Sequence, residues 1–286
     1  MKIKIDHSTT YYYSDQVSLG VHRLYLLPQF QEFQKILESK LSINPNPNGK
    51  GNKTDLVGNS FVQVWFADPT DRLIIQSEML IDCVEINPFG FIIDPYFISN
   101  FNAPDFNGFR YRDDSSQLIQ PYIHREFTAD LSEFTRSIGL KVDTFLDFLV
   151  KLTAAIHAGW THIIREEEDF WAADKTFESQ KGSCRDLAWM QMNMLGSLGL
   201  ASRFVSGYAF NPELASGHEL HAWLETYLPG AGWIGLDPSL GLLTNHFYVP
   251  LAYHPDPSKT LPVQGSYAGE ANSKLETDVI ISQVAP

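Results

Sequence analysis

Cysteine is scarce in this sequence, with only Cys83 and Cys184 among 286 residues. Two thiols are too few for a disulfide scaffold and too few to hold a zinc ion in a cage of thiolates. Positive charge is also in short supply, because 21 Lys and Arg residues face 34 Asp and Glu residues, which gives a formal charge of −13. Such an acidic surface repels phosphate backbones and anionic lipid head groups, so we expect neither nucleic acid nor a membrane as a partner. Cys83 lies in an alternating segment and is interpreted as a packing residue.

Long hydrophobic runs are absent as well. The stretch 145–152 is interrupted by Asp147 and Lys151, and it is far shorter than the roughly 18 residues of a membrane-spanning helix. Residues 1–15 alternate polar and apolar side chains and lack the apolar core of a secretory signal. No glycine-rich phosphate loop or dinucleotide fingerprint occurs, so no cofactor is expected. We therefore expect a soluble, cytoplasmic protein.

The first third of the chain is rich in β-branched and aromatic residues, which alternate with polar ones in 61–66, 72–75 and 77–84. This pattern predicts antiparallel β-structure. Segment 44–52 contains mainly turn-forming residues and is predicted to be an exposed loop. Around 102–114 the composition shifts to Asn, Pro, Asp and Gly, and the hydrophobic period then changes from two to nearer 3.6. We expect an α+β protein with a β-rich N-terminal domain at 1–105 and a second domain at 106–286.

A long amphipathic helix is predicted in the second domain. Asp143 or Thr144 can cap its first turn, and its apolar stripe runs at helical spacing from Phe145 to Trp160 and Ile163. This helix is expected to pack against the core of that domain.

Cys184 lies at the expected start of another helix, with Ser183 as a plausible N-cap. The unsatisfied N–H groups and the positive dipole end of a helix favour the thiolate, which is the nucleophilic form of cysteine. Gly182 leaves room for a substrate carbonyl, and the N–H of Cys184 is free to help hold an oxyanion. Arg185 and Asp186 are expected to pair with each other or to support the helix start.

A cysteine nucleophile needs an imidazole as a base and a third group that fixes the tautomer of that imidazole. Segments 221–228 and 233–236 flank a Pro-Gly-Ala-Gly turn and are predicted to form a hairpin. A turn centred near Gly230 puts His221 opposite Ser239 and makes Asp237 its diagonal neighbour on the same face. The catalytic residues predicted by this arrangement are Cys184, His221 and Asp237.

Other residues near the hairpin receive more ordinary interpretations. Trp223 and Trp233 are expected in the core beneath it, although either could lie beside a substrate. His218 precedes His221 by three residues, and on one strand the two imidazoles would face opposite sides. If His218 lies in a loop, a metal site formed by His218, His221 and Asp237 remains an alternative; otherwise no metal is expected.

The sequence contains the motifs GSCRDLA at 182–188, SRFVSGY at 202–208 and HAWLETYLPGAGWIGLDPS at 221–239. These three motifs resemble the transglutaminase-like superfamily of papain-type cysteine enzymes, in its bacterial branch. Residues 7–13 and Gly58-Asn59 are similar to the β-rich N-terminal region that often precedes this core in bacteria. The resemblance implies an α+β core in which the cysteine heads a helix packed on an antiparallel sheet that carries the His and the Asp.

The same resemblance implies acyl transfer through a thioester, without a cofactor. Cys184 would be the nucleophile, His221 the general base and then acid, and Asp237 the residue that orients the imidazole. Resolution of the thioester by water would make the protein a peptidase or amidase acting on peptide or isopeptide bonds, which we expect. Resolution by an amine would make it a protein-glutamine transglutaminase, and a catalytically silent binding module is a further alternative. The expected partner is a peptide or polypeptide substrate.

Overall fold

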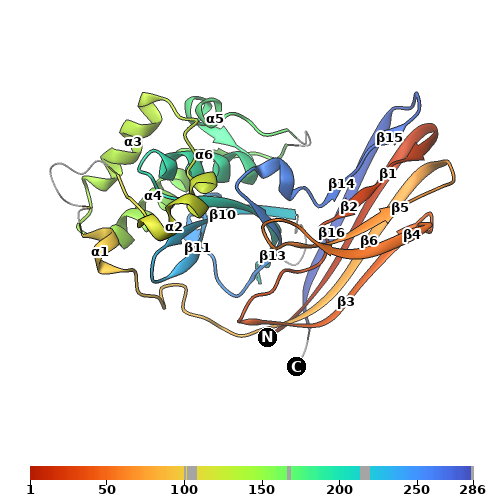
Figure 1. The fold of residues 1–286 in the computed structure, drawn as a ribbon, viewed down its shortest axis with the longest axis horizontal. Helices are drawn as coiled ribbons and strands as arrows, with labels where there is room; N and C mark the ends of the chain where they lie inside the picture. The colour runs from red at the N-terminus through yellow and green to blue at the C-terminus, as the bar shows by residue number, and fades with distance from the viewer. Residues whose placement is uncertain (100, 102–107, 166–168, 213–219, 285–286) are drawn as a thin grey trace.

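The chain folds into two lobes that lie side by side (Figure 1). The computed structural model describes residues 1–99, 101, 108–165, 169–212 and 220–284. One lobe, here called the β lobe, consists of strands, whereas the mixed lobe carries helices on a central sheet. Both chain termini lie together at the foot of the β lobe (Figure 1). The predicted α+β class is confirmed.

Two sheets form the β lobe. Their strands are β1 (Lys2–Leu19), β2 (His22–Leu24), β3 (Gln34–Asn44), β4 (Gly49–Thr54), β5 (Ser60–Trp65), β6 (Thr70–Cys83), β14 (Val263–Gln264), β15 (Tyr267–Ala268) and β16 (Ser273–Val284). One sheet has the order β15-β1-β6-β3, with β16 also paired to β1, and the other has the order β14-β2-β5-β4. Alternate residues such as Ile5, Val64 and Ile75 are buried in a shared core, because successive side chains of a strand point to opposite faces.

The C-terminal strand returns to the N-terminal sheet. β16 pairs with β1 over its whole length, from Lys2 opposite Val284 to Tyr13 opposite Ser273. The expected division at residue 105 therefore marks only the first crossing between the lobes. Residues 263–284 belong with the β lobe, although the prediction placed them in the second domain. The apolar alternation of Val279 and Ile281, both buried in the β-lobe core, accounts for this pairing.

The segment predicted as an exposed loop at 44–52 is partly a strand. Its second half begins β4, which pairs with β5 so that Gly49 lies opposite Trp65. A Cβ at position 49 would lie 2.0 Å from Cζ2 of Trp65, so the glycine leaves space for the indole ring. The prediction was wrong here because a glycine that admits a cross-strand aromatic ring is indistinguishable in sequence from a turn glycine.

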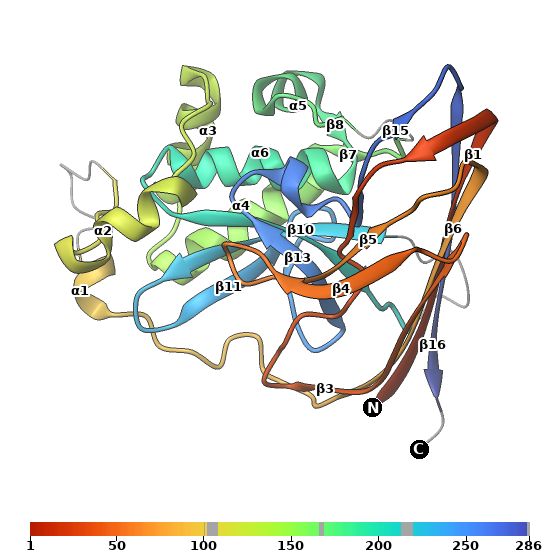
Figure 2. The ribbon, with the colours of Figure 1, turned by 45° about the vertical axis from the view of Figure 1, so that its right-hand side comes forward.

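The mixed lobe contains the central sheet, ordered β12-β11-β10-β9-β13. Its elements are α1 (Pro95–Ile98), α2 (Asp113–Ile119), α3 (Ala129–Gly139), α4 (Phe145–Gly159), β7 (Thr161–His162), α5 (Ala173–Ser179), β8 (Lys181–Gly182), α6 (Cys184–Gly196), β9 (Ser202–Ala209), β10 (Leu220–Leu228), β11 (Gly232–Asp237), β12 (Leu242–Leu243) and β13 (Tyr248–His254), with 3₁₀ turns at Gln120–Tyr122 and Pro257–Thr260. Helices α4 and α6 share one core with the sheet, whereas Tyr208, Val249 and Leu251 join the β-lobe core. The central sheet therefore lies between the helices and the β lobe, as Figure 2 shows. None of the helices in the described ranges is long and apolar enough to cross a membrane.

Helix α4 begins where the sequence predicts but ends earlier. The hydroxyl of Thr144 accepts a hydrogen bond from the N–H of Asp147 at 3.1 Å, which makes Thr144 the N-cap. The helix ends at Gly159, so the predicted extension to Ile163 is wrong. The chain leaves the helix because the next residues pair in parallel with β8, and Trp160 remains buried at the turn.

Candidate active site

Cys184 is the first residue of α6, and the residues around it fix the backbone at this helix start. Ser183 is the N-cap, as predicted, and its N–H and hydroxyl donate to Oδ2 of Asp186 at 2.9 and 2.8 Å. Gly182 is buried, and a Cβ there would lie 2.9 Å from Cβ of Asp186 and 3.1 Å from Cγ2 of Thr176. The absent side chain at 182 therefore permits close packing of the helix start. The sequence had suggested that Gly182 leaves room for a substrate carbonyl; in the structure Gly182 is buried and is not among the residues that line the cleft described below.

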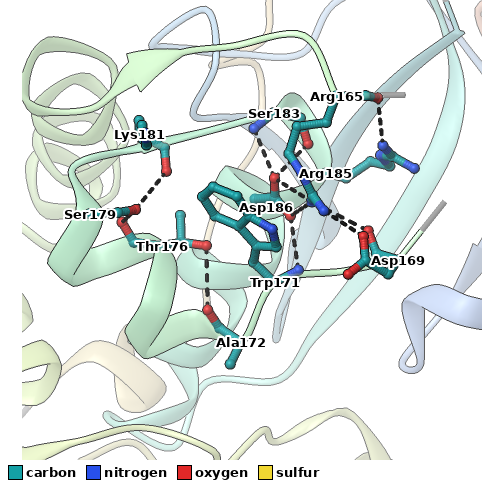
Figure 3. Close-up of polar contacts among 10 residues, drawn as sticks. All are labelled: Arg165, Asp169, Trp171, Ala172, Thr176, Ser179, Lys181, Ser183, Arg185 and Asp186. Atoms are coloured by element: carbon teal, nitrogen blue, oxygen red, sulfur yellow. Dashed lines mark hydrogen bonds and ion pairs between the residues drawn. The ribbon is translucent and has the colours of Figure 1, made fainter. Parts of the chain in front are cut away.

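Asp186 is fully buried, and its cationic partner is Arg165 (Figure 3). Nη1 of Arg165 lies 2.9 and 3.0 Å from the two carboxylate oxygens, and the N–H of Trp171 donates to Oδ1 at 3.0 Å. The guanidinium of Arg165 also lies over the Trp171 ring, 4.5 Å from its centroid, and pairs with Asp169. Arg185 does not pair with Asp186; it donates to the backbone carbonyl of Arg165 at 3.1 Å. This network ties the segment before the helix to the first turn of α6.

The hairpin of β10 and β11 has the predicted register. Leu224 lies opposite Leu236, and extension of this antiparallel pairing puts His221 opposite Ser239. Nε2 of His221 lies 2.7 Å from Oδ2 of Asp237. Because Nε2 is engaged with the carboxylate, Nδ1 is the ring nitrogen left to face the thiol.

Asp237 is fully buried, and both of its carboxylate oxygens are hydrogen-bonded. The N–H and hydroxyl of Ser239 donate to Oδ1 at 2.9 and 2.6 Å, and the hydroxyl of Tyr248 donates to Oδ2 at 2.8 Å. Burial raises the pKa of this carboxyl, but the charge of His221 and these hydrogen bonds outweigh burial and lower it. Burial lowers the pKa of His221, and the charge of Asp237 raises it well above its usual value. The sequence did not point to Tyr248.

The ring of Trp223 lies against His221. Trp223 is buried, as predicted, with its ring centroid 6.4 Å from that of His221 at an interplanar angle of 25°. It also meets Tyr248 edge to face at 5.2 Å. Trp233 lies instead against the guanidinium of Arg203, 4.4 Å from its ring centroid. Neither tryptophan lines the cleft described below.

Two imidazoles, those of His162 and His221, interact with Cys184. Burial raises the pKa of the thiol, but hydrogen bonds to both imidazoles and their charges outweigh burial and bring the pKa to about 6. The hydrogen bond to Cys184 is also the main reason why the pKa of His162 is raised. Sequence reasoning missed His162 because it was assigned to the end of the preceding helix.

A cleft of about 1040 Å³ opens at Cys184, and residues of both lobes line it. Cys184, His162 and His221 line one side. The β1–β16 sheet forms another wall of the cleft. Its lining residues are cross-strand pairs, namely His7 with Val279, Thr9 with Thr277, and Tyr11 with Leu275. Nδ1 of His7 lies 2.7 Å from the hydroxyl oxygen of Tyr208 in β9, so this wall is joined to the central sheet.

The remaining candidates lie apart from this site or outside the description. Cys83 is 1% exposed, and burial raises its pKa to about 11, in keeping with the packing role expected from the sequence. His218, on which the alternative metal site depended, lies outside the described residues. Within the described ranges, no group of three or more His, Cys, Asp or Glu side chains is placed to hold a metal ion.

Comparison with known proteins places this architecture among transglutaminase-like proteins. Residues 134–238 match the transglutaminase-like superfamily, and residues 3–82 match the bacterial transglutaminase-like N-terminal region. The chain therefore belongs to the transglutaminase-like superfamily and carries the N-terminal region of its bacterial members. This result confirms the resemblance seen in the three sequence motifs.

Uncharacterized mycobacterial proteins are similar to this chain over nearly their whole length. The chain is 24% identical over 298 residues to the uncharacterized protein Rv2569c of Mycobacterium tuberculosis, which covers 97% of this chain and 91% of the relative. It is 20% identical over 298 residues to the uncharacterized protein ML0607 of Mycobacterium leprae, covering 99% of each. The fold is similar to a solved structure described as "a Putative Cysteine Protease from Cytophaga hutchinsonii", with a TM-score of 0.71 and 20% identity over 100% of this chain and 92% of that one.

Proposed function

We propose that this protein is a cysteine-dependent enzyme that hydrolyses peptide or isopeptide amide bonds through a thioester on Cys184. The observation that carries the proposal is one series of interacting groups. Cys184 and His221 line the same cleft, the charge of His221 helps to lower the pKa of the thiol, and Nε2 of His221 lies 2.7 Å from Oδ2 of the buried Asp237. A nucleophile, a base and a group that orients the base are the minimum set for acyl transfer. The presence of all three favours an enzyme over a binding module of the same fold.

Acylation begins with the thiolate of Cys184, which a pKa of about 6 makes the main form at neutral pH. The sulfur attacks the carbonyl carbon of the amide, the C=O π-electrons move to oxygen, and the resulting oxyanion is stabilised by N–H donors at the helix start. The C–N bond then breaks while the protonated His221 gives its proton to the leaving amine. Asp237 stabilises the imidazolium that this sequence requires, because its carboxylate is buried beside the ring.

Deacylation needs a nucleophile that gives its proton to the neutral His221. Water adds to the thioester carbonyl, the C–S bond breaks, and the thiolate of Cys184 returns with a carboxylic acid as the product. One observation supports water over an amine as the acceptor: the Cytophaga protein of the same fold is described as "a Putative Cysteine Protease".

A polypeptide is the substrate class that best fits the cleft. Its volume of about 1040 Å³ reaches the upper end of the range for small-molecule sites. Apolar side chains such as Phe204, Leu240 and Val263 line it together with hydroxyl groups of the β lobe. A peptide segment can lie between this wall and Cys184, with its backbone groups facing the polar side chains.

The reaction type can be tested with unfolded casein, offered together with dansylcadaverine, a primary amine that can accept the acyl group. Mass spectrometry of the products separates the two outcomes. Hydrolysis creates new termini with the addition of water, whereas transfer to the amine releases ammonia and attaches the dansyl group to glutamine. We expect new termini in the wild type and in Cys83→Ala, a matched control at the other cysteine, and none in Cys184→Ala.

Two results would contradict the proposal. Dansyl incorporation without new termini would make the protein a transglutaminase. A wild type that forms neither product above the level of Cys184→Ala on casein or on short glutamine-containing peptides would favour the binding module.

A further inference from the structure

Two imidazoles line the cleft together with Cys184; the mechanism above uses that of His221, and His162 has no part in it. β7, which carries His162, pairs in parallel with β8, so that His162 lies beside Gly182. The N–H of Thr161 donates to the carbonyl of Gln180 at 2.9 Å, and that of Ile163 donates to the carbonyl of Gly182 at 3.0 Å. Backbone hydrogen bonds on both sides therefore hold His162 next to the segment that leads directly into Cys184.

His162 and His221 differ in their surroundings. The side chain of His221 is 17% exposed and is bonded to the buried Asp237, as a general base requires. His162 is exposed and lines the cleft, and no carboxylate in the described part of the chain hydrogen-bonds to it. Without such an orienting group, His162 is not equipped as a second base. It is equipped as a donor, because even a neutral imidazole carries one N–H.

The hydrogen bond from His162 has an acceptor at every stage of the reaction. In the resting enzyme the acceptor is the thiolate of Cys184, because His162 lies beside Gly182 and lines the same cleft as Cys184; the raised pKa of His162 agrees with this placement. When the sulfur bonds to the carbonyl carbon, the negative charge moves from sulfur to an oxygen only two bonds away. A donor that faced the sulfur is then within reach of this oxygen, and the bonded sulfur is only a weak acceptor.

We propose that His162 is a further catalytic residue, whose imidazole N–H donates a hydrogen bond to the oxyanion of the tetrahedral intermediate from the cleft side of Cys184. This inference rests on the proposed function. The N–H passes from the thiolate to the oxyanion without proton transfer, so the proton balance with His221 is unchanged. The exposed position of His162 allows the carbonyl oxygen of a bound substrate to lie between it and the start of α6.

The test compares two reactions of Cys184 in the same variants. Acylation by p-nitrophenyl acetate builds an oxyanion, whereas alkylation by iodoacetamide does not. Both rates are measured at about pH 9.5, above the usual pKa of a thiol, so that loss of thiolate does not contribute. The variants are His162→Ala, which has no donor, and His162→Gln, which has a neutral donor. Thr161→Ala, at an exposed neighbour outside the cleft, is the matched control.

We expect His162→Ala to alkylate within about twofold of the wild type, and its acylation to fall about 10²- to 10³-fold, as for loss of one oxyanion donor. His162→Gln should recover acylation to within about tenfold of the wild type, and Thr161→Ala should behave as the wild type. Unchanged thermal melting and Cys184 alkylation establish that each variant is folded.

The proposal is overturned if His162→Ala acylates within about threefold of the wild type, well below the effect of an oxyanion donor. Equal losses of acylation and alkylation would also overturn it, since the residue would then act only on the thiol. Failure of the proposed function looks different, because the wild type itself would then acylate no faster than Cys184→Ala.

Discussion

The two cysteines are predicted to differ sharply in their reactivity towards iodoacetamide. Burial raises the pKa of both, but at Cys184 the imidazoles of His162 and His221 outweigh burial, so the values are about 6 for Cys184 and about 11 for Cys83. At about pH 6 half of Cys184 is then thiolate, against about 10⁻⁵ of Cys83. A thiolate of lower pKa is intrinsically less nucleophilic, by about half a log unit in rate for each unit of its pKa. The net rate ratio is therefore about 10²–10³, and the 1% exposure of Cys83 increases it.

The assay labels the native protein briefly across a pH series and quantifies the two cysteine peptides by mass spectrometry. Cys184 should be labelled with a midpoint near pH 6, and at that pH about tenfold faster than glutathione. His221→Ala should move the midpoint upward by about 1 to 3 pH units, and Cys83→Ala should leave it unchanged. A midpoint near the usual value of about 8.5, or equal labelling of the two cysteines, would refute the electrostatic description of the site.

Three further predictions concern the groups around this centre. Arg165→Met should lower the free energy of unfolding in urea by about 3 to 5 kcal/mol, because the fully buried Asp186 loses its cation; a loss below about 1 kcal/mol would contradict this. Asp237→Asn should lower kcat/KM for peptide hydrolysis about 10²- to 10⁴-fold, since the amide cannot stabilise the imidazolium of His221, and unchanged kcat/KM would count against the triad. Burial lowers the pKa of His7 from 6.5 to about 4, so between these pH values the unfolded chain binds more protons than the folded protein. The stability that the neutral, buried His7 contributes is therefore full above pH 6.5 and is lost as the pH falls to about 4. Between pH 6.5 and 4 the free energy of unfolding should therefore fall by about 3 kcal/mol less in His7→Gln than in the wild type. Equal slopes of the free energy of unfolding against pH in the two proteins would show that His7 does not titrate in this way.

Local signals predicted the parts of the site that depend on nearby residues. The hairpin register follows from a short turn between two alternating segments, so the pairing of His221 with Asp237 was within reach of the sequence. The start of α6 was also predictable, because Ser183 has the N-cap preference and the residues after it have helical spacing.

Contacts between distant segments were missed because no local pattern specifies them. His162 reaches the cleft beside Cys184 because β7 pairs in parallel with β8, and Trp160 continued the helical spacing up to that point. Arg165 binds Asp186 across 21 residues, whereas the sequence suggested the adjacent Arg185. The alternating pattern of β16 is visible in the sequence, but its pairing with β1 at the other end of the chain is not.

The central claim is that Cys184 becomes acylated, and the most direct measurement is the mass of the enzyme trapped during turnover. The wild type is mixed rapidly with a peptide p-nitrophenyl ester, quenched in acid and analysed intact and after digestion. The account predicts one acyl group, located on the peptide that contains Cys184, removable by hydroxylamine and absent from Cys184→Ala. An acyl group on Cys83, or equal acylation of the wild type and Cys184→Ala, would contradict it.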